Sequence, residues 1–260
     1  MLRRSDGGAQ SMTNRYTRVR NLLGPLVNLY ARVQLERHSP WPDDGRGVIL
    51  ASNHAGHLWW DSLCLAAAFP DIQIRFIAHH WDAKIGPIKK LLDQLDVLYL
   101  DAQLENISPD NAVVNALKSG AVTCLYPEES YHTFWRRYTV HRLSPHILKY
   151  AQLARVPIVP TAMIGVEEAA PCLLGYKPSG VPLHIPVLPP LILPMKVTIL
   201  LGEPTSFEAL TGMDPEQEAT TEILQRGADK LQLQMAALLR KHRPRARTSQ
   251  LRYIDHQGWW

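Results

Sequence analysis

A histidine and an aspartate follow a short apolar segment in the first quarter of the chain. Residues 48–51 are apolar, His54 comes three positions later, and six residues separate it from Asp61. An imidazole that donates from one ring nitrogen to a carboxylate is held in one tautomer, and its other nitrogen can remove a proton from an attacking hydroxyl. The pair therefore predicts general-base chemistry at the end of a strand.

A metal site is the first alternative for this segment, because His54, His57 and Asp61 could all serve as ligands. The sequence offers no second cluster of ligands, and Gly56 breaks the helical spacing that such sites favour. We therefore expect neither a metal nor another cofactor. A serine hydrolase has no candidate nucleophile, since the chain lacks a G-x-S-x-G motif. Cys124 falls within an apolar strand and is predicted to be a core residue.

The elements around the pair alternate between apolar strands and helices from residue 47 onward. Such alternation is typical of an α/β fold with a mostly parallel central sheet flanked by helices, here in a single domain. Sites in these sheets lie where strands end, which is where His54 falls. We predict strands at 48–51, 72–78, 97–100, 121–126, 156–164 and 196–201, and helices at 63–69 and 85–95, after Ser108-Pro109, after Ser144-Pro145 and after Asp214-Pro215-Glu216.

The ends of the chain differ in composition from its middle. Residues 1–14 are polar and are expected to be disordered, 15–243 to form the domain, and 244–260 to be a basic C-terminal tail. Lys118 and Gly120 should end the helix that follows Ser108. The last helix carries an apolar stripe of Leu224, Ala228, Leu231, Met235 and Leu238.

The net charge of +4 is concentrated in two segments, residues 15–37 and 240–247, which are rich in arginine. Such clusters could hold the protein against an anionic bilayer or a nucleic-acid backbone. The chain has no nucleic-acid-binding motif, so nucleic acid is disfavoured as a partner. Residues 16–35 place apolar side chains at helical spacing between arginines, which suits a helix packed on the core or one whose apolar face enters the membrane surface.

The cysteines and the apolar segments of the sequence indicate in which cellular compartment the protein functions. The three cysteines lie far apart, which favours a reducing environment over a disulfide framework. The first residues lack the apolar region of a secretory signal, and no run of about 18 apolar residues is present. We therefore expect a cytoplasmic protein that associates peripherally with the membrane.

Two further motifs follow the histidine and aspartate along the chain. Residues 125–130 are Leu-Tyr-Pro-Glu-Glu-Ser, and residues 156–160 are Val-Pro-Ile-Val-Pro, which continue into Gly-Val-Glu-Glu at 165–168. This order of blocks resembles the lysophospholipid and glycerolipid acyltransferase superfamily over about residues 32–205. Residues 165–168 resemble a subset of that superfamily whose third block continues into a G-x-E-E segment.

The resemblance implies an O-acyltransferase that moves a fatty acyl group from acyl-CoA or acyl carrier protein to a lipid alcohol. It implies His54 as general base and Asp61 as its orienting partner, with Asn53 and Gly56 shaping the catalytic loop. The acceptor-binding block would contribute Pro127, Glu128 and Ser130, with Arg136 and Arg137 close behind. Lys84, Lys89 and Lys90 could meet the phosphates of the donor or face solvent.

The sequence departs from the family pattern at three places. The commonest motif has four residues between histidine and aspartate, so His57, with three, is a second candidate base. Glu129 replaces a glycine of the acceptor block, and Asp101 stands where an arginine usually holds the acceptor's phosphate. A carboxylate in place of a cation disfavours an anionic head group and points to a neutral alcohol, unless Arg136 or Arg137 replaces the cation.

These departures keep two other functions open. One is a non-catalytic lipid-binding or membrane-adaptor protein of the same fold, which the changes at Asp101 and Glu129 suggest. The other is a thioester hydrolase in which His54 activates water in place of an alcohol. The presence of both His54 and Asp61 favours the transferase.

Overall fold

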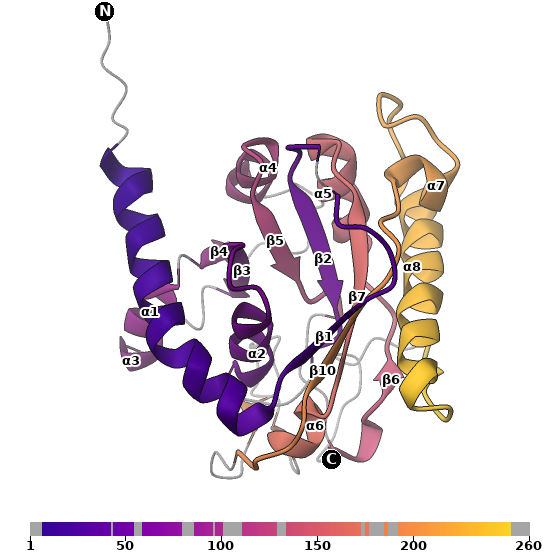
Figure 1. The fold of residues 1–260 in the computed structure, drawn as a ribbon. Coiled ribbons are helices and arrows are strands. Elements are labelled where there is room, and N and C mark those ends of the chain that lie inside the picture. The colour runs from indigo at the N-terminus through magenta and orange to yellow at the C-terminus, as the bar shows by residue number, and fades with distance from the viewer. Residues whose placement is uncertain are drawn as a thin grey trace, which may run out of the picture.

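The computed structural model describes residues 7–42, 44–54, 59–79, 86–95, 97–100, 111–128, 134–172, 175–176, 185–186 and 192–250. Over these residues a central seven-stranded sheet has the order β1-β10-β7-β2-β5-β3-β4, with helices on both of its faces (Figure 1). Every neighbouring pair is parallel except β10 with β7. The predicted α/β fold with a mostly parallel sheet is confirmed.

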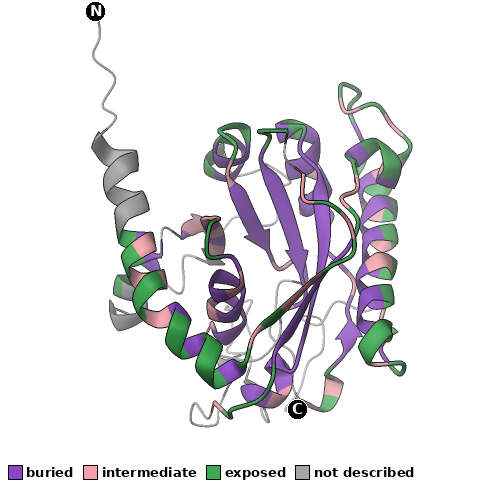
Figure 2. Cartoon of the chain, viewed as in Figure 1, coloured by how far each residue is buried: buried purple, intermediate pink, exposed green. Residues whose placement is uncertain are grey.

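The central strands are buried on both sides, which explains their nearly continuous apolar sequences. Burial is complete along β2, β5, β7 and β10 (Figure 2). Sequence analysis missed β1, because this edge strand is half exposed and carries polar residues. The strands of the sheet are β1 Gln34–Arg37, β2 Val48–Ser52, β3 Ile74–His79, β4 Leu98–Leu100, β5 Val122–Leu125, β7 Ile158–Ile164 and β10 Thr198–Leu201.

One face of the sheet is covered by α1 Gly7–Ala31, α2 Trp60–Ala68, α3 Gly86–Gln94 and the short α6 Val166–Ala169. Helix α1 packs on α2 and α3, and Pro25 lies inside it without dividing it. The helix begins at Gly7, inside the segment for which disorder was predicted, because residues such as Ala9, Gln10 and Met12 are compatible with a helix. Over the described residues, no helix is long and apolar enough to cross a bilayer.

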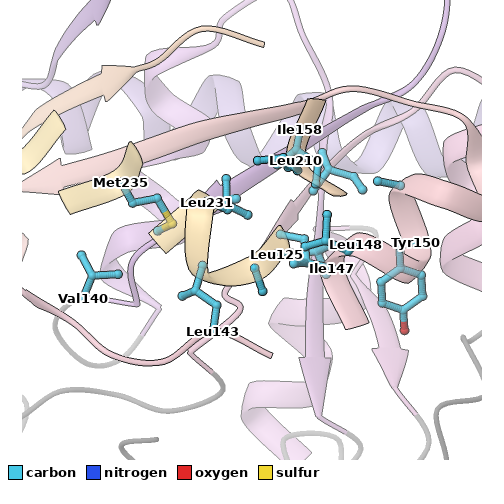
Figure 3. Close-up of a cluster of buried hydrophobic side chains, with 14 of the residues drawn as sticks. Leu125, Val140, Leu143, Ile147, Leu148, Tyr150, Ile158, Leu210, Leu231 and Met235 are labelled. Carbon is cyan, nitrogen blue, oxygen red and sulfur yellow. The ribbon is translucent and has the colours of Figure 1, made fainter. Parts of the chain in front are cut away.

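The other face is covered by α4 Asn111–Lys118, α5 His146–Ala154, α7 Phe207–Thr211 and α8 Thr221–His242. Figure 3 shows the core on this side, where Leu231 and Met235 of α8 lie among side chains of α5, α7 and the sheet. The predicted apolar stripe of α8 is buried along its whole length. Helix α4 ends at Lys118 as predicted, with Gly120 at φ +88°, and residues 108–109 lie outside the described residues.

The predicted start of the last helix was wrong. Asp214 accepts a hydrogen bond from the backbone N–H of Glu216 in a local turn, so its carboxylate caps no helix. Helix α8 begins at Thr221, and the hydroxyl of Thr220 caps it by accepting from the N–H of Ile223. Helix α5 does begin just after Pro145, but the Ser144 hydroxyl bonds to His146 Nδ1, so the predicted serine cap is absent.

The described part of the basic C-terminal segment, residues 244–250, packs against the domain. Strand β11 Arg247–Thr248 pairs in parallel with β6 Thr139–Val140. The N–H of Ser249 donates to the carbonyl of Val140 over 2.9 Å, and Gln232 of α8 donates to the carbonyl of Ser249 over 2.8 Å. The segment between α6 and β10 is rich in proline. Within it, β8 Gly175–Tyr176 pairs with β9 Ile185–Pro186.

Candidate active site

The parallel strands β2, β5 and β7 end at the same edge of the sheet, and the loops that follow them carry the predicted motifs. Asn53, just after β2, connects the loop that it begins to strand β7. Its side-chain oxygen accepts from the N–H of Met163 over 2.7 Å, and its side-chain nitrogen donates to the Met163 carbonyl over 3.3 Å. Because Met163 lies in β7, this pair of bonds fixes the start of the catalytic loop to the neighbouring strand.

His54 and Asp61 meet across the loop despite its length. The distance from His54 Nδ1 to Asp61 Oδ2 is 2.6 Å, and Asp61 is completely buried. Asp61 lies in the first turn of α2, where the positive end of the helix dipole favours a carboxylate. Its second oxygen accepts from the N–H of Ser62 over 2.7 Å. The six-residue separation is therefore compatible with the contact. His57 and Gly56 lie outside the described residues.

Glu128 connects the catalytic loop to the chain that follows β6. One of its oxygens accepts from the N–H of His54 over 3.3 Å and the other from the N–H of His141 over 2.6 Å. Its side chain is buried. The neighbouring Pro127 is buried too, and its carbonyl accepts from the N–H of Ser144 over 2.7 Å. Through these contacts Glu128 and Pro127, both predicted in the acceptor block, join the end of β5 to the backbone of His54 and to the segment after β6, while Ser130 lies outside the described residues.

Two side chains that the sequence analysis did not single out complete the network. The ring of Tyr126 stacks on that of His54, with 4.2 Å between centroids and 22° between planes. The Tyr126 hydroxyl lies 2.7 Å from Ser62 Oγ, which is itself 3.3 Å from Asp61 Oδ1. Burial, and then the nearby Asp61 carboxylate, raise the pKa of Tyr126 well above its usual value, so the phenol stays protonated. The sequence did hold a signal for these two side chains, because Ser62 directly follows Asp61 and Tyr126 is the tyrosine of the Tyr-Pro-Glu block.

All three cysteines are buried free thiols within the described residues. Burial raises the pKa of Cys64 and Cys124, and the charge of Asp61 adds to the effect. Burial also raises the pKa of Cys172 to about 11. The prediction that Cys124 is a core residue is confirmed, because its side chain is inaccessible. A buried thiol that keeps its proton is a poor nucleophile.

Residues 165–168 support the segment that reaches Glu128. Both carboxylate oxygens of Glu167 accept from the N–H of Tyr138 over 3.2 Å, and the Tyr138 hydroxyl donates to Glu168. Tyr138 has a φ of +59°, which the Glu167 contact helps to hold. Gly165 has a φ of +91°, and a Cβ there would lie 2.1 Å from the Lys196 carbonyl oxygen, so a side chain does not fit.

Arg136 is the last residue of the 3₁₀ helix Phe134–Arg136, and Arg137 follows it. Both lie in the segment between Glu128 and β6. The guanidinium of Arg137 donates to the Phe134 carbonyl over 3.1 Å and lies 4.2 Å from the centroid of the Phe134 ring. Arg137 also lines a cleft together with the C-terminal segment 243–247. Asp101 and Glu129, the two charged departures from the family pattern, lie outside the described residues.

An apolar cleft of about 700 Å³ lies between α1 and α2. Trp60, the residue before Asp61, lines it and makes an edge-to-face contact with Tyr30 at 6.1 Å. The Tyr30 hydroxyl donates to the carbonyl of Ile192 over 2.7 Å, which ties α1 to the segment before β10. The cleft is lined by Leu26, Val27, Leu29, Tyr30, Arg32, Trp60, Ile192 and Pro194.

The sequence model of the acyltransferase family matches residues 29–164, which is just over half of the chain and includes His54, Asp61 and Glu128. The chain belongs to the acyltransferase family. This membership agrees with the resemblance to the acyltransferase superfamily that the order of the motifs suggested. The match does not separate the subset with the G-x-E-E segment from the rest of the family.

This acyltransferase-family chain is similar to three uncharacterized mycobacterial proteins, one from Mycobacterium bovis and two from strains of Mycobacterium tuberculosis. Each is 29% identical over 223 residues, which are 78% of this chain and 60% of the relative. The chain thus spans about 60% of the length of these curated relatives.

Among solved structures, the chain is similar to the 1-acyl-sn-glycerophosphate (LPA) acyltransferase PlsC from Thermotoga maritima. The TM-score is 0.58 at 17% sequence identity, and the match covers 88% of this chain and 80% of the other. At this identity the likeness shows a shared fold. It agrees with the single α/β domain described above.

Proposed function

We propose that this protein transfers a fatty acyl group from a thioester donor to the hydroxyl of a lipid alcohol. The observation that carries the proposal is the 2.6 Å contact between His54 Nδ1 and Asp61 Oδ2 at the sheet edge, in a chain of the acyltransferase family. A buried carboxylate that engages one ring nitrogen prepares the other for proton transfer.

The reaction is a direct transfer between two bound substrates. His54 Nε2 takes the proton of the acceptor hydroxyl as its oxygen attacks the thioester carbonyl, and Asp61 stabilises the imidazolium that forms. The tetrahedral intermediate collapses as the carbon–sulfur bond breaks, and the imidazolium returns the proton to the leaving thiolate. Backbone N–H groups near the loop would stabilise the oxyanion. The products are a lipid ester and a free thiol.

The other residues of the network position this pair. Asn53 fixes the loop to β7, and Glu128 holds the backbone of His54 against that of His141. Tyr126 covers one side of the imidazole ring and, through Ser62, supports Asp61. A base held on several sides loses less entropy on reaching the transition state.

The apolar cleft between α1 and α2 suits a hydrocarbon chain. Trp60, which precedes Asp61 in the sequence, is part of its lining, and most of the other lining residues are aliphatic or aromatic.

The outer face of α1 suits the surface of a membrane. Leu22, Leu26 and Leu29 are exposed by 71%, 60% and 80%, and Figure 2 shows exposed positions along this part of the helix. Arg15, Arg18 and Arg20 lie on the preceding turns. Exposed leucines flanked by arginines favour peripheral contact with an anionic bilayer.

The acceptor is proposed to be a neutral lipid alcohol. Asp101 and Glu129 add negative charge to the blocks that hold the acceptor, which disfavours a phosphate there. Arg136 and Arg137 are the cations of that region, and either could reverse this preference. The acceptor panel below includes both classes.

The test is transfer of radiolabelled palmitate by purified protein on lipid vesicles. Palmitoyl-CoA and palmitoyl-acyl carrier protein are each offered with lysophosphatidate, lysophosphatidylcholine, diacylglycerol and long-chain alcohols. His54→Ala is the inactive variant, and His38→Ala, at an exposed histidine, is the matched control. We expect a lipid ester with wild type and with His38→Ala only.

Each other outcome contradicts the transferase. Free palmitate in place of ester, made only when His54 is present, would establish a hydrolase. Vesicle binding without turnover of any donor would establish a lipid-binding protein. Equal activity of wild type and His54→Ala would remove the proposed general base.

A further inference from the structure

A second cleft, of about 610 Å³, lies away from the apolar one and has the opposite chemistry. Four arginines line it, against one carboxylate, that of Glu168, so the lining carries a net charge of +3 (4 − 1). Arg137 comes from the segment before β6, and Arg243, Arg245 and Arg247 come from the segment after α8. Pairing of β6 with β11 brings these two distant segments together.

One oxygen of the single carboxylate of this arginine cleft is already engaged by protein groups. The Tyr138 hydroxyl donates to Glu168, and Arg243 lies 3.9 Å from it with its guanidinium 5.0 Å from the centroid of the Tyr138 ring. Arg137 and Arg245 are exposed, and so is Arg247, which also bonds to Thr139 over 3.3 Å. The cleft therefore presents guanidinium groups that can still bind an anion.

An aromatic side chain stands at the same cleft. Trp135 is 64% exposed and lines it beside Arg137. Exposed tryptophan next to several arginines is suited to a ligand with both a flat ring and phosphate groups, because the ring can stack while the guanidinium groups bind phosphate oxygens. The volume is in the range of small-molecule sites.

The arginine cleft is connected to the catalytic loop by a short stretch of chain. Tyr138 lines the cleft, and three residues later the N–H of His141 donates to Glu128, which also binds the backbone of His54. Three residues of extended chain span about 10 Å. A ligand whose phosphate end lies in the cleft could thus reach His54 with a flexible arm.

We propose that the arginine cleft binds the adenosine-phosphate end of a coenzyme A thioester, with Trp135 against the adenine ring and Arg137, Arg245 and Arg247 at the phosphates. This assignment rests on the acyl-transfer function proposed above and specifies its donor. The cleft is lined by residues next to β6 and after α8, and these elements lie on the other side of the sheet from α1 (Figure 1). The exposed leucines of α1 can therefore meet a bilayer while the cleft stays open to a soluble nucleotide.

The experiment separates this proposal from the transferase itself. Binding of adenosine 3′,5′-bisphosphate is measured by calorimetry on the His54→Ala protein, which needs no turnover. In parallel, wild type and Arg245→Ala/Arg247→Ala, two exposed arginines of the cleft that are not candidates for acceptor binding, are compared with palmitoyl-CoA and with palmitoyl-pantetheine, which lacks the nucleotide. Arg226→Ala, at an exposed arginine of α8 outside the cleft, is the control.

We expect the double variant to bind the nucleotide and palmitoyl-CoA at least about tenfold more weakly and to use palmitoyl-pantetheine as well as wild type does. Trp135→Ala should weaken nucleotide binding by a smaller factor. If the wild-type enzyme transfers palmitate but the double variant keeps its KM for palmitoyl-CoA, the cleft is not the donor site although the function stands. Transfer from no donor would instead reject the function.

Two further results would overturn the assignment. Equal competition by inorganic phosphate and by the nucleotide would show a site for small anions without recognition of the adenosine. Loss of binding to anionic vesicles in the double variant, with nucleotide affinity unchanged, would make the cleft a contact for lipid head groups.

Discussion

The two clefts of the molecule differ in chemistry and in how the chain builds them. The apolar cleft lies between α1 and α2, is lined by leucines and aromatic rings, and adjoins Asp61 through Trp60. The arginine cleft joins the segment before β6 to the one after α8 and carries a net positive charge. A fatty acyl-CoA has the same two characters, a hydrocarbon chain at one end and phosphates at the other. The difference between the clefts is what the two proposals above depend on, since each cleft is proposed to bind one end of the donor.

Removing the charge of Asp61 should have the largest effect, because in the proposed function both clefts deliver a substrate to the pair that Asp61 forms with His54. Asp61→Asn keeps the shape of the side chain but no longer stabilises an imidazolium at His54. We expect kcat for palmitate transfer to fall by about 10³- to 10⁴-fold. Asp71→Asn, at an exposed aspartate, is the control. A loss of less than tenfold would mean that His54 is not the base.

The positioning role of Glu128 is tested by Glu128→Gln, which lets one side-chain oxygen accept where two do now. Each hydrogen bond of a charged group contributes about 1.5–3 kcal/mol, so the free energy of unfolding should drop by roughly that amount. Because the backbone of His54 loses its support, kcat should fall by about tenfold or more. Glu216→Gln removes only an exposed ion pair with Arg155 and should change neither quantity. A change in KM for the acceptor alone would favour direct acceptor binding by Glu128.

The proposed membrane contact of α1, the helix that also lines the apolar cleft, is tested by Leu22→Ser/Leu26→Ser/Leu29→Ser. These side chains are exposed, so the melting temperature should change little, while the protein should bind anionic vesicles about ten- to hundredfold more weakly. Leu153→Ser/Leu233→Ser, at exposed leucines of α5 and α8, is the matched control. Flotation with vesicles measures the binding of both variants, and thermal unfolding measures their melting temperatures. Equal loss by the control would show that the contact is unspecific.

The smallest effect concerns alkaline pH. Burial and the Asp61 charge raise the pKa of Tyr126 in the folded protein above its value of about 10 in the unfolded chain. The protonated phenol therefore contributes its full stabilisation below pH 10. This stabilisation is lost as the pH rises further, because the unfolded chain then loses the proton more readily than the folded protein does. Above about pH 10 the free energy of unfolding should fall by about 1.4 kcal/mol more per pH unit in wild type than in Tyr126→Phe. Denaturation by urea at several pH values measures the slopes, with Tyr30→Phe as control. Parallel slopes for wild type and Tyr126→Phe would contradict the buried phenol.

Much of the fold and the central pair could be predicted, because their signals are local. Strands β2, β5 and β7 are buried on both sides and are therefore apolar throughout. His54 and Asp61 lie a few residues apart just after one of them. The wrong start of α8 has a local cause as well, since an aspartate before a proline suits a turn as well as a cap and only the turn formed at Asp214.

The arginine cleft could not be predicted for the opposite reason. It depends on the pairing of β6 with β11, two strands of two residues each that lie about a hundred positions apart. Such short strands have no periodicity, and the basic composition of residues 240–247 suited a solvated tail equally well. The stacking of Tyr126 on His54 is likewise a long-range contact between loops that the sequence does not encode as a spacing.

The late position of β11 in the chain has a consequence for biosynthesis. A ribosome makes His54, Asp61, Glu128 and residues 165–168 well before residues 243–248, so the partners of the catalytic pair can begin to fold first. The arginine cleft can form only once α8 and β11 have been translated. A nascent chain would therefore acquire its base before it could hold the nucleotide of the donor. Pausing of translation near residue 240 would prolong this interval.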